Sequence, residues 1–235
     1  MSSAAPLVLL TGFEPFGGMA HNPSWDVATA VAERAAGSLD PTGPASPTGP
    51  TDVPGLEVRA LRLPVAFGRA AGLLADAVDA AVAEGRTPAA VVALGLAAGT
   101  EAVRLERVGL NLRDARIPDN DGAQPADEPV VASGEGALFS TLRLKAALAR
   151  IREAGIPVHL SLSAGSFVCN DVLYALLHDL SARGLDVPGG FVHVPDLRDP
   201  QSPVSLAQAV EAVELLLAET LRGGADSSVP GGALH

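Results

Sequence analysis

The chain has few aromatic residues, an excess of acidic over basic residues, and a single cysteine. Aromatic residues make up 3% of the 235 positions, so alanine, valine and leucine must fill most of the core. One cysteine cannot form a disulfide within the chain, which fits a reducing compartment. The 16 basic and 27 acidic residues give a formal charge of −11, and an acidic surface repels phosphate backbones and anionic lipid. We therefore expect neither nucleic acid nor a membrane among the partners.

Long hydrophobic runs and recognisable targeting signals are also missing. The apolar run at residues 6–10 is too short to cross a bilayer, and no basic segment precedes it. We expect no signal peptide, no membrane segment and a cytoplasmic location. No cluster of histidine, cysteine and acidic residues has the spacing of metal ligands. The sequence therefore predicts no metal site, and we expect no cofactor.

What the chain does contain is an alternation of strand-like and helix-like segments. Strands are expected at residues 7–10, 58–63, 90–94, 107–112, within 160–170, and at 190–195. Helices are expected at residues 22–36, 67–84, 140–154, 172–177 and 204–221. This order predicts one α/β domain over residues 1–235, with a mixed sheet covered on both faces. We expect a flexible loop at 37–55 and a frayed tail at 223–235.

The single cysteine, Cys169, lies between an expected strand and the helix expected at 172–177. At or just before a helix N-terminus, the helix dipole and unpaired backbone N–H groups favour a thiolate. Such a residue is either a nucleophile or, as free cysteines usually are, a small buried hydrophobic residue. A reactive, accessible thiol also oxidises readily, so we expect activity to require a reductant.

A cysteine nucleophile needs a base, and His193 differs from the other histidines because it lies near the end of an expected strand. In an open α/β sheet, ligands gather beyond the carboxyl ends of strands, where the turn at Cys169 also lies. Adjacent strands would bring the thiol and the imidazole within hydrogen-bond reach. The alternative for His193 is a hydrogen-bonded residue in a half-buried strand.

Two further charged residues have both a functional and an ordinary interpretation. Glu106 lies between apolar residues at an expected strand start, where it would either orient a histidine or remain solvated at a sheet edge. Arg116 lies in the turn-rich loop at residues 114–122 and either faces the site or forms a surface ion pair of little energetic weight.

Four motifs in sequence order carry a resemblance to a known family. They are residues 11–18 (TGFEPFGG) with 22–24, then 106–108, 163–170 and 190–195. From Val8 to Leu197 the chain resembles the pyroglutamyl peptidase I family, the pyrrolidone carboxyl peptidases of cysteine type. The resemblance implies a three-layer α/β/α sandwich with a twisted mixed sheet, and in many members a homotetramer. It also implies removal of an N-terminal pyroglutamyl residue from peptides.

The resemblance further implies roles for single residues. Cys169 matches the family's nucleophile, His193 its base, and Glu106 the acid that orients the histidine. Arg116 matches an arginine near the reacting carbonyl, and the backbone of Leu96 matches a segment that binds the lactam. The residues that match the lining of the pyrrolidone pocket are Phe13, Phe16, Ile117, Phe167 and Val168.

This assignment agrees with the chemistry of the substrate. Pyroglutamate is a flat, uncharged lactam, which two phenylalanines from one loop would hold by apolar contact while backbone groups bind its N–H and C=O. His193 would deprotonate Cys169, and the thiolate would attack the pyroglutamyl carbonyl to give a thioester. The backbone N–H of Cys169, together with Arg116, would stabilise the oxyanion.

Three positions depart from the family pattern. Arg104 stands where Ser or Thr is usual, two residues before Glu106, Gly109 replaces an alanine, and Leu96 stands where a polar side chain is common. We expect the cation of Arg104 to pair with Glu106 and weaken its hold on His193. The Leu96 contact would survive because it uses the backbone.

Two other functions remain open from the sequence. The first is a related thiol hydrolase that acts on another small lactam or amide. The second is a non-catalytic α/β module that binds a small molecule or nucleotide, for which the glycine pattern at residues 95–99 is the only support. That pattern lacks the spacing of a dinucleotide-binding loop.

Overall fold

The computed structural model describes residues 5–39 and 55–232. Of the loop expected at 37–55, residues 40–54 lie outside the described residues, while residues 37–39 close the first helix. The elements in chain order are β1 Leu7–Phe13, α1 Pro23–Leu39, β2 Glu57–Leu63, α2 Arg69–Ala83, β3 Ala90–Leu96, β4 Val103–Glu106, β5 Val108–Leu110, β6 Ala137–Phe139, α3 Leu144–Glu153, β7 Val158–Ser161, α4 Val168–Ala182, β8 Gly189–Val194 and α5 Leu206–Leu221.

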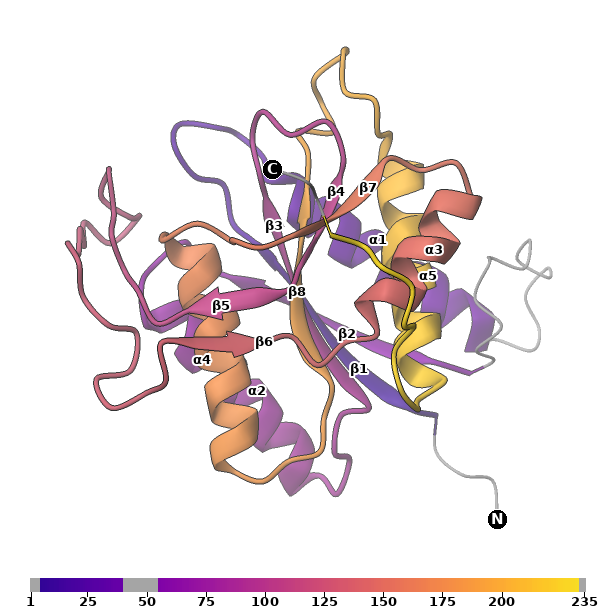
Figure 1. The fold of residues 1–235 in the computed structure, drawn as a ribbon, viewed down its shortest axis with the longest axis horizontal. Coiled ribbons are helices and arrows are strands. Elements are labelled where there is room, and N and C mark those ends of the chain that lie inside the picture. The colour runs from indigo at the N-terminus through magenta and orange to yellow at the C-terminus, as the bar shows by residue number, and fades with distance from the viewer. Residues whose placement is uncertain (1–4, 40–54, 233–235) are drawn as a thin grey trace.

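Six strands form one twisted sheet through the centre of the molecule, in the order β2-β1-β3-β8-β4-β7 (Figure 1). Strands β2, β1, β3 and β8 run parallel, whereas β4 pairs antiparallel with β8 and parallel with β7. The mixed sheet predicted from the sequence is therefore confirmed. The carboxyl ends of β1, β3 and β8 meet at one edge of the sheet.

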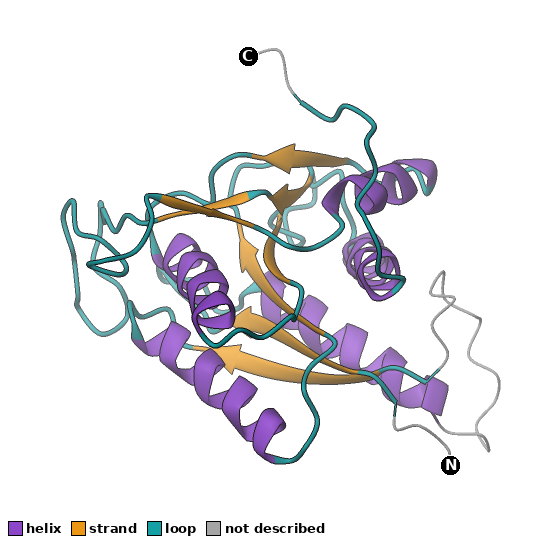
Figure 2. Ribbon diagram, turned by 60° about the horizontal axis from the view of Figure 1, so that its bottom comes forward, coloured by secondary structure: helices purple, strands orange, loops and turns teal. Residues whose placement is uncertain are grey.

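Helices cover both faces of this sheet (Figure 2). Because successive side chains of a strand point to opposite faces, Val8 and Leu10 pack with α1, α3 and α5, while Leu7 and Leu9 pack with α2 and α4. The strands are apolar on both sides, as parallel strands between two helical layers must be. The architecture is thus the three-layer α/β/α sandwich that the resemblance implied.

Three local predictions differ from the structure. The strand expected at 107–112 is shorter, and its residues Val108–Leu110 pair with β6 in a separate two-stranded sheet. The strand β4, directly before it, was not predicted because charged residues occupy two of its four positions. The strand expected within 160–170 ends at Ser161, and the chain turns through Gly165, which has a positive φ of 82°, before α4 begins at Val168.

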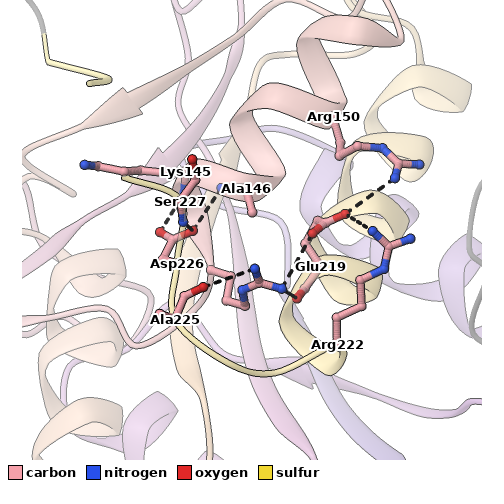
Figure 3. Close-up of polar contacts among 9 residues, drawn as sticks. Lys145, Ala146, Arg150, Glu219, Arg222, Ala225, Asp226 and Ser227 are labelled. Atoms are coloured by element: carbon pink, nitrogen blue, oxygen red, sulfur yellow. Dashed lines mark hydrogen bonds and ion pairs between the residues drawn. The ribbon is translucent and has the colours of Figure 1, made fainter. Parts of the chain in front are cut away.

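The tail expected to fray packs against the body as far as it is described. The carboxylate of Asp226 accepts hydrogen bonds of 2.9 Å from the backbone N–H groups of Lys145 and Ala146, in the first turn of α3 (Figure 3). A negative charge there stabilises the helix through its exposed N–H groups and its dipole. Nearby, the buried carboxylate of Glu219 forms ion pairs with three arginines, namely Arg143, Arg150 and Arg222.

Candidate active site

A cavity of about 620 Å³ opens where the carboxyl ends of β1, β3 and β8 meet the N-terminus of α4. Among its lining residues are Phe13 at the end of β1, Leu96 at the end of β3, and His193 in β8. The first turn of α4 and the residue before it supply Phe167, Val168 and Cys169. Residues far apart in the sequence therefore meet at the edge of the sheet where α/β folds bind ligands.

Cys169 is the second residue of α4 and is partly exposed to the cavity. Its sulfur lies against β3 at Gly95, where a Cβ would come within 3.0 Å of Sγ and 2.7 Å of the ring of Phe191. Glycine at this position therefore provides the space that the thiol occupies. The thiol thus lies at the positive end of a helix, beside a strand end and open to a ligand.

Two buried polar residues fix the first turn of α4. The side-chain amide of Asn170 accepts a hydrogen bond from the backbone N–H of Leu110 and donates to the carbonyls of Leu110 and Leu112. The carboxylate of Asp171 accepts from the backbone N–H of Gly68 at 2.8 Å and from Nε of Arg113 at 2.6 Å. These contacts hold the turn that carries Cys169 against two neighbouring loops, so the thiol has a defined position.

His193 forms the buried link between Cys169 and Glu106. Nδ1 of His193 lies 2.8 Å from Oε1 of Glu106, and the two residues are 5% and 0% exposed. The antiparallel register of β4 and β8 sets Arg104 opposite His193, so Glu106 is the diagonal neighbour of His193 on the same face. The pairing of these two short strands therefore brings the acid to the imidazole.

The charge state of His193 follows from its two neighbours. Burial lowers the pKa of His193, but the charge of Cys169 and the hydrogen bonds to Cys169 and Glu106 raise it more, to about 9. With its pKa raised in this way, His193 is basic enough to hold a proton at neutral pH. A basic imidazole beside a thiol is the arrangement that activates a cysteine nucleophile.

Arg104 lies beside Glu106 without displacing His193. Its Nε is 3.7 Å from Oε1 of Glu106, which is an ion pair but not a hydrogen bond, and its Nη2 donates to Oγ of Ser161 at 2.9 Å. The contact that we expected between Arg104 and Glu106 is thus present as a longer ion pair. In the described part of the chain, Oε2 of Glu106 has no hydrogen-bond partner.

Phe13, Phe16 and Phe167 line the cavity, and Phe67 and Phe191 pack against these lining residues from outside it. The rings of Phe16 and Phe167 lie 5.2 Å apart, and Phe67 meets Phe167 edge-on at 5.1 Å from the other side. Phe191 packs between Phe13 and His193, with ring centroids 6.4 Å and 4.8 Å from them. The sequence reasoning missed Phe67 and Phe191, although the scarcity of aromatic residues would have drawn attention to both.

Three predicted site residues lie outside the cavity lining. One of them, Glu106, is fully buried beside His193. Arg116 and Ile117 are exposed in the loop between β5 and β6, Ile117 to 39%. That loop is attached near the site, because Asp119 accepts a 2.8 Å hydrogen bond from the backbone N–H of Phe67. Among the residues described, no group of three or more metal-ligating side chains occurs. Likewise, no helix within 5–39 and 55–232 is long and apolar enough to cross a membrane.

Comparison with known proteins gives a consistent result. The profile of the family described as pyroglutamyl peptidase matches residues 7–215. The pyrrolidone-carboxylate peptidases of Escherichia fergusonii and Erwinia tasmaniensis are each 43% identical to this chain over 234 residues, covering 97% of it and 99% of each relative.

Solved structures agree with the sequence comparison. The pyroglutamyl peptidase I of Bacillus amyloliquefaciens superposes with a TM-score of 0.79 at 30% identity, covering 94% of this chain and all of that one. The pyrrolidone carboxyl peptidase of Pyrococcus furiosus gives 0.74 at 34% identity, covering 92% of this chain and 98% of that one. With the cavity and its Cys–His–Glu contacts, these matches show that the chain belongs to the pyroglutamyl peptidase family.

Proposed function

We propose that this protein is a pyroglutamyl-peptidase I that releases an N-terminal pyroglutamyl residue through a thioester on Cys169. In this proposal His193 is the general base and acid, and Glu106 orients His193. Family membership supports the reaction. The observation that carries the residue assignment is that Cys169 and His193 line one cavity, and that Nδ1 of His193 lies 2.8 Å from Oε1 of the buried Glu106.

The steps follow from the charges of these groups. His193 takes the proton of Cys169, and the thiolate attacks the pyroglutamyl carbonyl to form a C–S bond. The imidazolium gives its proton to the leaving nitrogen as the C–N bond breaks, which leaves a thioester. Water, deprotonated by His193, then attacks the thioester and releases pyroglutamate, and the thiol is restored.

The developing oxyanion needs hydrogen-bond donors. The backbone N–H of Cys169 lies in the first turn of α4, where amides have no partner within the helix. It is therefore the donor closest to the new bond. Arg116 is a proposed second donor, but it is exposed in a loop outside the cavity lining, so its contribution requires the loop to close over the substrate.

The apolar part of the cavity suits the pyrrolidone ring. Phe13, Phe16, Phe167 and Val168 offer apolar contact, and the end of β3 at Leu96 presents backbone groups to the lactam. An uncharged ring has no need of an ionic partner. The cavity is also larger than one lactam ring, which favours a peptide over an isolated lactam as substrate.

Substrate selection separates this proposal from the alternative of a general lactam or amide hydrolase. We expect hydrolysis of a fluorogenic pyroglutamyl amide, and no release from the prolyl amide, which lacks the ring carbonyl. Free 2-pyrrolidone should remain intact. Hydrolysis of the free lactam without turnover of the pyroglutamyl amide would contradict the proposal.

We also propose that the protein acts in the cytoplasm as a homotetramer, as the family resemblance suggests. Light scattering after gel filtration measures the mass of the assembly directly. The proposal predicts four times the chain mass of 23.7 kDa. A single-chain mass at working concentration would contradict the tetramer, and it would leave the peptidase assignment unaffected.

A further inference from the structure

Arg104 is a cation in the wall of a cavity that is otherwise largely apolar. Among the described residues that line the cavity, it is the only arginine or lysine, and none is an aspartate or glutamate. The other titratable residues in the lining are His21, Cys169 and His193. The mechanism proposed above gives Arg104 no role, so its place in the lining needs a separate account.

The strand order places Arg104 at the opposite end of the cavity from the phenylalanine pocket. Across the sheet, the strands β1, β3, β8 and β4 are neighbours and contribute in turn Phe13, Leu96, His193 and Arg104 to the lining. Three strand spacings separate the first from the last, a distance of about 14 Å. With the pyrrolidone ring at the β1 end and the scissile bond near His193, the rest of the peptide must lie over β4.

The pairing of β4 with β8 supports the same placement. Arg104 lies directly opposite His193 in the antiparallel register, so the two side chains are on the same face of the sheet. His193 is the group that gives its proton to the leaving nitrogen in the proposed mechanism. Arg104, next to His193, is therefore adjacent to the substrate residue that contains the leaving nitrogen.

The guanidinium of Arg104 has donors to spare. The structure gives it one hydrogen bond, to Ser161, and one longer ion pair, with Glu106. Of the five N–H donors of a guanidinium, the one on Nε is buried beside Glu106 and one on Nη2 binds Ser161, which leaves three, and the side chain is 32% exposed. The bond to Ser161 fixes the orientation of the head, and the remaining donors suit a carboxylate, which guanidinium groups bind with two parallel hydrogen bonds.

We propose that Arg104 binds the residue that follows pyroglutamate and favours a carboxylate there. The carboxylate is either an acidic side chain or, in a pyroglutamyl dipeptide, the C-terminal group. This inference rests on the proposed function. It assigns the selection of the leaving peptide to Arg104, a residue that departs from the family pattern.

Two pairs of substrates distinguish the sources of the carboxylate. The first comparison is between the kcat/KM values of pyroglutamyl-glutamate amide and pyroglutamyl-glutamine amide, and it tests an acidic side chain. The second is between pyroglutamyl-alanine and its amide, and it tests the C-terminal carboxylate. We expect kcat/KM of the wild type to favour the charged member of at least one pair by about fivefold, the size expected for an ion pair with a partly exposed arginine. Because the attraction is between charges, the ratio should fall as salt is added.

Variants identify the residue responsible. In Arg104→Met the ratio should fall to near one, and in Arg104→Lys it should be intermediate because the charge remains without the planar fork. Arg198→Met is the matched control, since it removes an arginine that pairs with Asp26 at the surface, outside the cavity lining, and it should keep the wild-type ratio. Folding of each variant is checked by circular dichroism.

The outcomes separate this inference from the function on which it rests. If the wild type hydrolyses none of the four substrates, the proposed function fails. If it hydrolyses them with ratios near one, or if Arg104→Met keeps the ratio, the carboxylate site is overturned. A uniform loss on all substrates with the ratio unchanged would mean that Arg104 acts only through Glu106, which also overturns it. Should Arg104→Met not fold, the salt dependence of the wild-type ratio and the Arg104→Lys variant decide the question.

Discussion

At the scale of single residues, the site depends on three titratable side chains that are held in contact by different elements. Cys169 comes from the start of α4, His193 from β8 and Glu106 from β4. The carboxylate is fully buried and the imidazole nearly so. Burial lowers the pKa of His193, so its raised value is caused by the two residues beside it, Cys169 and Glu106.

The pKa of His193 gives the first test of this arrangement. The value is raised from 6.5 to about 9, so the imidazolium persists through neutral pH and loses its proton as the pH rises through about 9. Since the proposed mechanism gives this proton to the leaving amine, kcat/KM should fall over the same range. Titration of His193 by NMR should give an apparent value near 9 for the coupled pair.

The matched variant for that titration is Cys169→Ala. It removes the thiolate charge and a hydrogen bond, the two strongest causes that raise the pKa of His193. The effect of burial then outweighs the remaining contact with Glu106, so the pKa of His193 should drop toward or below its ordinary level. A value that stays near 9 in this variant would show that the thiol and imidazole are not paired.

Replacement of the acid tests the role of Glu106. Glu106→Gln keeps the size of the side chain but removes its charge, so it no longer stabilises the imidazolium. We expect kcat to fall by up to about 10⁴-fold, the loss seen when the orienting acid of a serine-protease triad is amidated. The pKa of His193 should fall as well. Glu153→Gln, at a surface carboxylate with 73% exposure, is the control and should keep full activity; an equal loss in both variants would contradict the assignment.

The sequence identified some of these residues better than others. Cys169 and His193 were found because each lies near the start or end of a strand or helix. The periodicity of apolar residues in the sequence indicates where those elements begin and end. Glu106 had an ordinary reading as a solvated edge carboxylate, and only the family resemblance favoured the role of orienting acid. Arg104 was noticed as a departure, yet its place in the cavity wall depends on strand pairing, which a single sequence does not specify.

At the scale of elements, the contact between β1 and α1 is unusually close. A Cβ added at Gly12 would come within 2.6 Å of the carbonyl oxygen of Ser24 and of the Cα of Trp25, both backbone atoms. Ser24 also accepts a 3.0 Å hydrogen bond from the backbone N–H of Phe13, which ties the helix start to the strand end. Glycine at position 12 therefore allows α1 to begin beside the cavity.

Substitution of this glycine should cost stability. Backbone atoms cannot move aside as a side chain can, so Gly12→Ala should lower the free energy of unfolding by about 1–3 kcal/mol. Gly72→Ala is the control, because it lies in α2 with no atom within 4 Å of the added Cβ, and it should stabilise by about 0.5–1 kcal/mol. Urea unfolding measures both changes. Equal effects at the two positions would contradict the close contact.

Elements were predictable where apolar periodicity was strong. The helices around 67–84 and 204–221 and the strands at the centre of the sheet were found with small errors at their ends. The strand β4 was missed because Arg104 and Glu106 interrupt its apolar pattern, and these charges are tolerated only because they face the cavity and His193. The pattern thus failed at the element that carries part of the site.

At the scale of the whole molecule, two apolar clusters on opposite faces share one sheet. We propose on this basis that residues 1–235 form a single folding domain. The only tryptophan, Trp25, packs against one cluster from α1, and the only tyrosine, Tyr174, is fully buried in α4 on the other face. Each residue therefore reports on one face of the sandwich.

These two probes test whether the molecule unfolds as one unit. The fluorescence of Trp25 and the near-ultraviolet signal of Tyr174 should change in one coincident transition with urea, together with the far-ultraviolet circular dichroism. Two separate midpoints would show that the faces unfold independently, and would contradict a single cooperative domain. Repeating the titration at several protein concentrations separates unfolding from subunit dissociation.

The overall architecture was predictable because alternating strands and helices allow few arrangements. The strand order and the antiparallel direction of β4 were not predictable, because the pairing of strands depends on contacts between segments that are distant in the sequence. The hairpin of β5 and β6 and the attachment of the tail at Asp226 depend on such contacts as well. The roles proposed for Glu106 and Arg104 rest on strand pairing, so their positions could be found only from the structure.

The measurement that tests the central claim most directly is the turnover of a fluorogenic pyroglutamyl amide by the wild type and by Cys169→Ser, both under reducing conditions. The variant keeps the shape of the site but replaces the thiol with a much weaker nucleophile. We predict rapid turnover by the wild type and a loss of at least about a thousandfold in the variant, with both proteins folded. Turnover by Cys169→Ser within tenfold of the wild type would contradict the account.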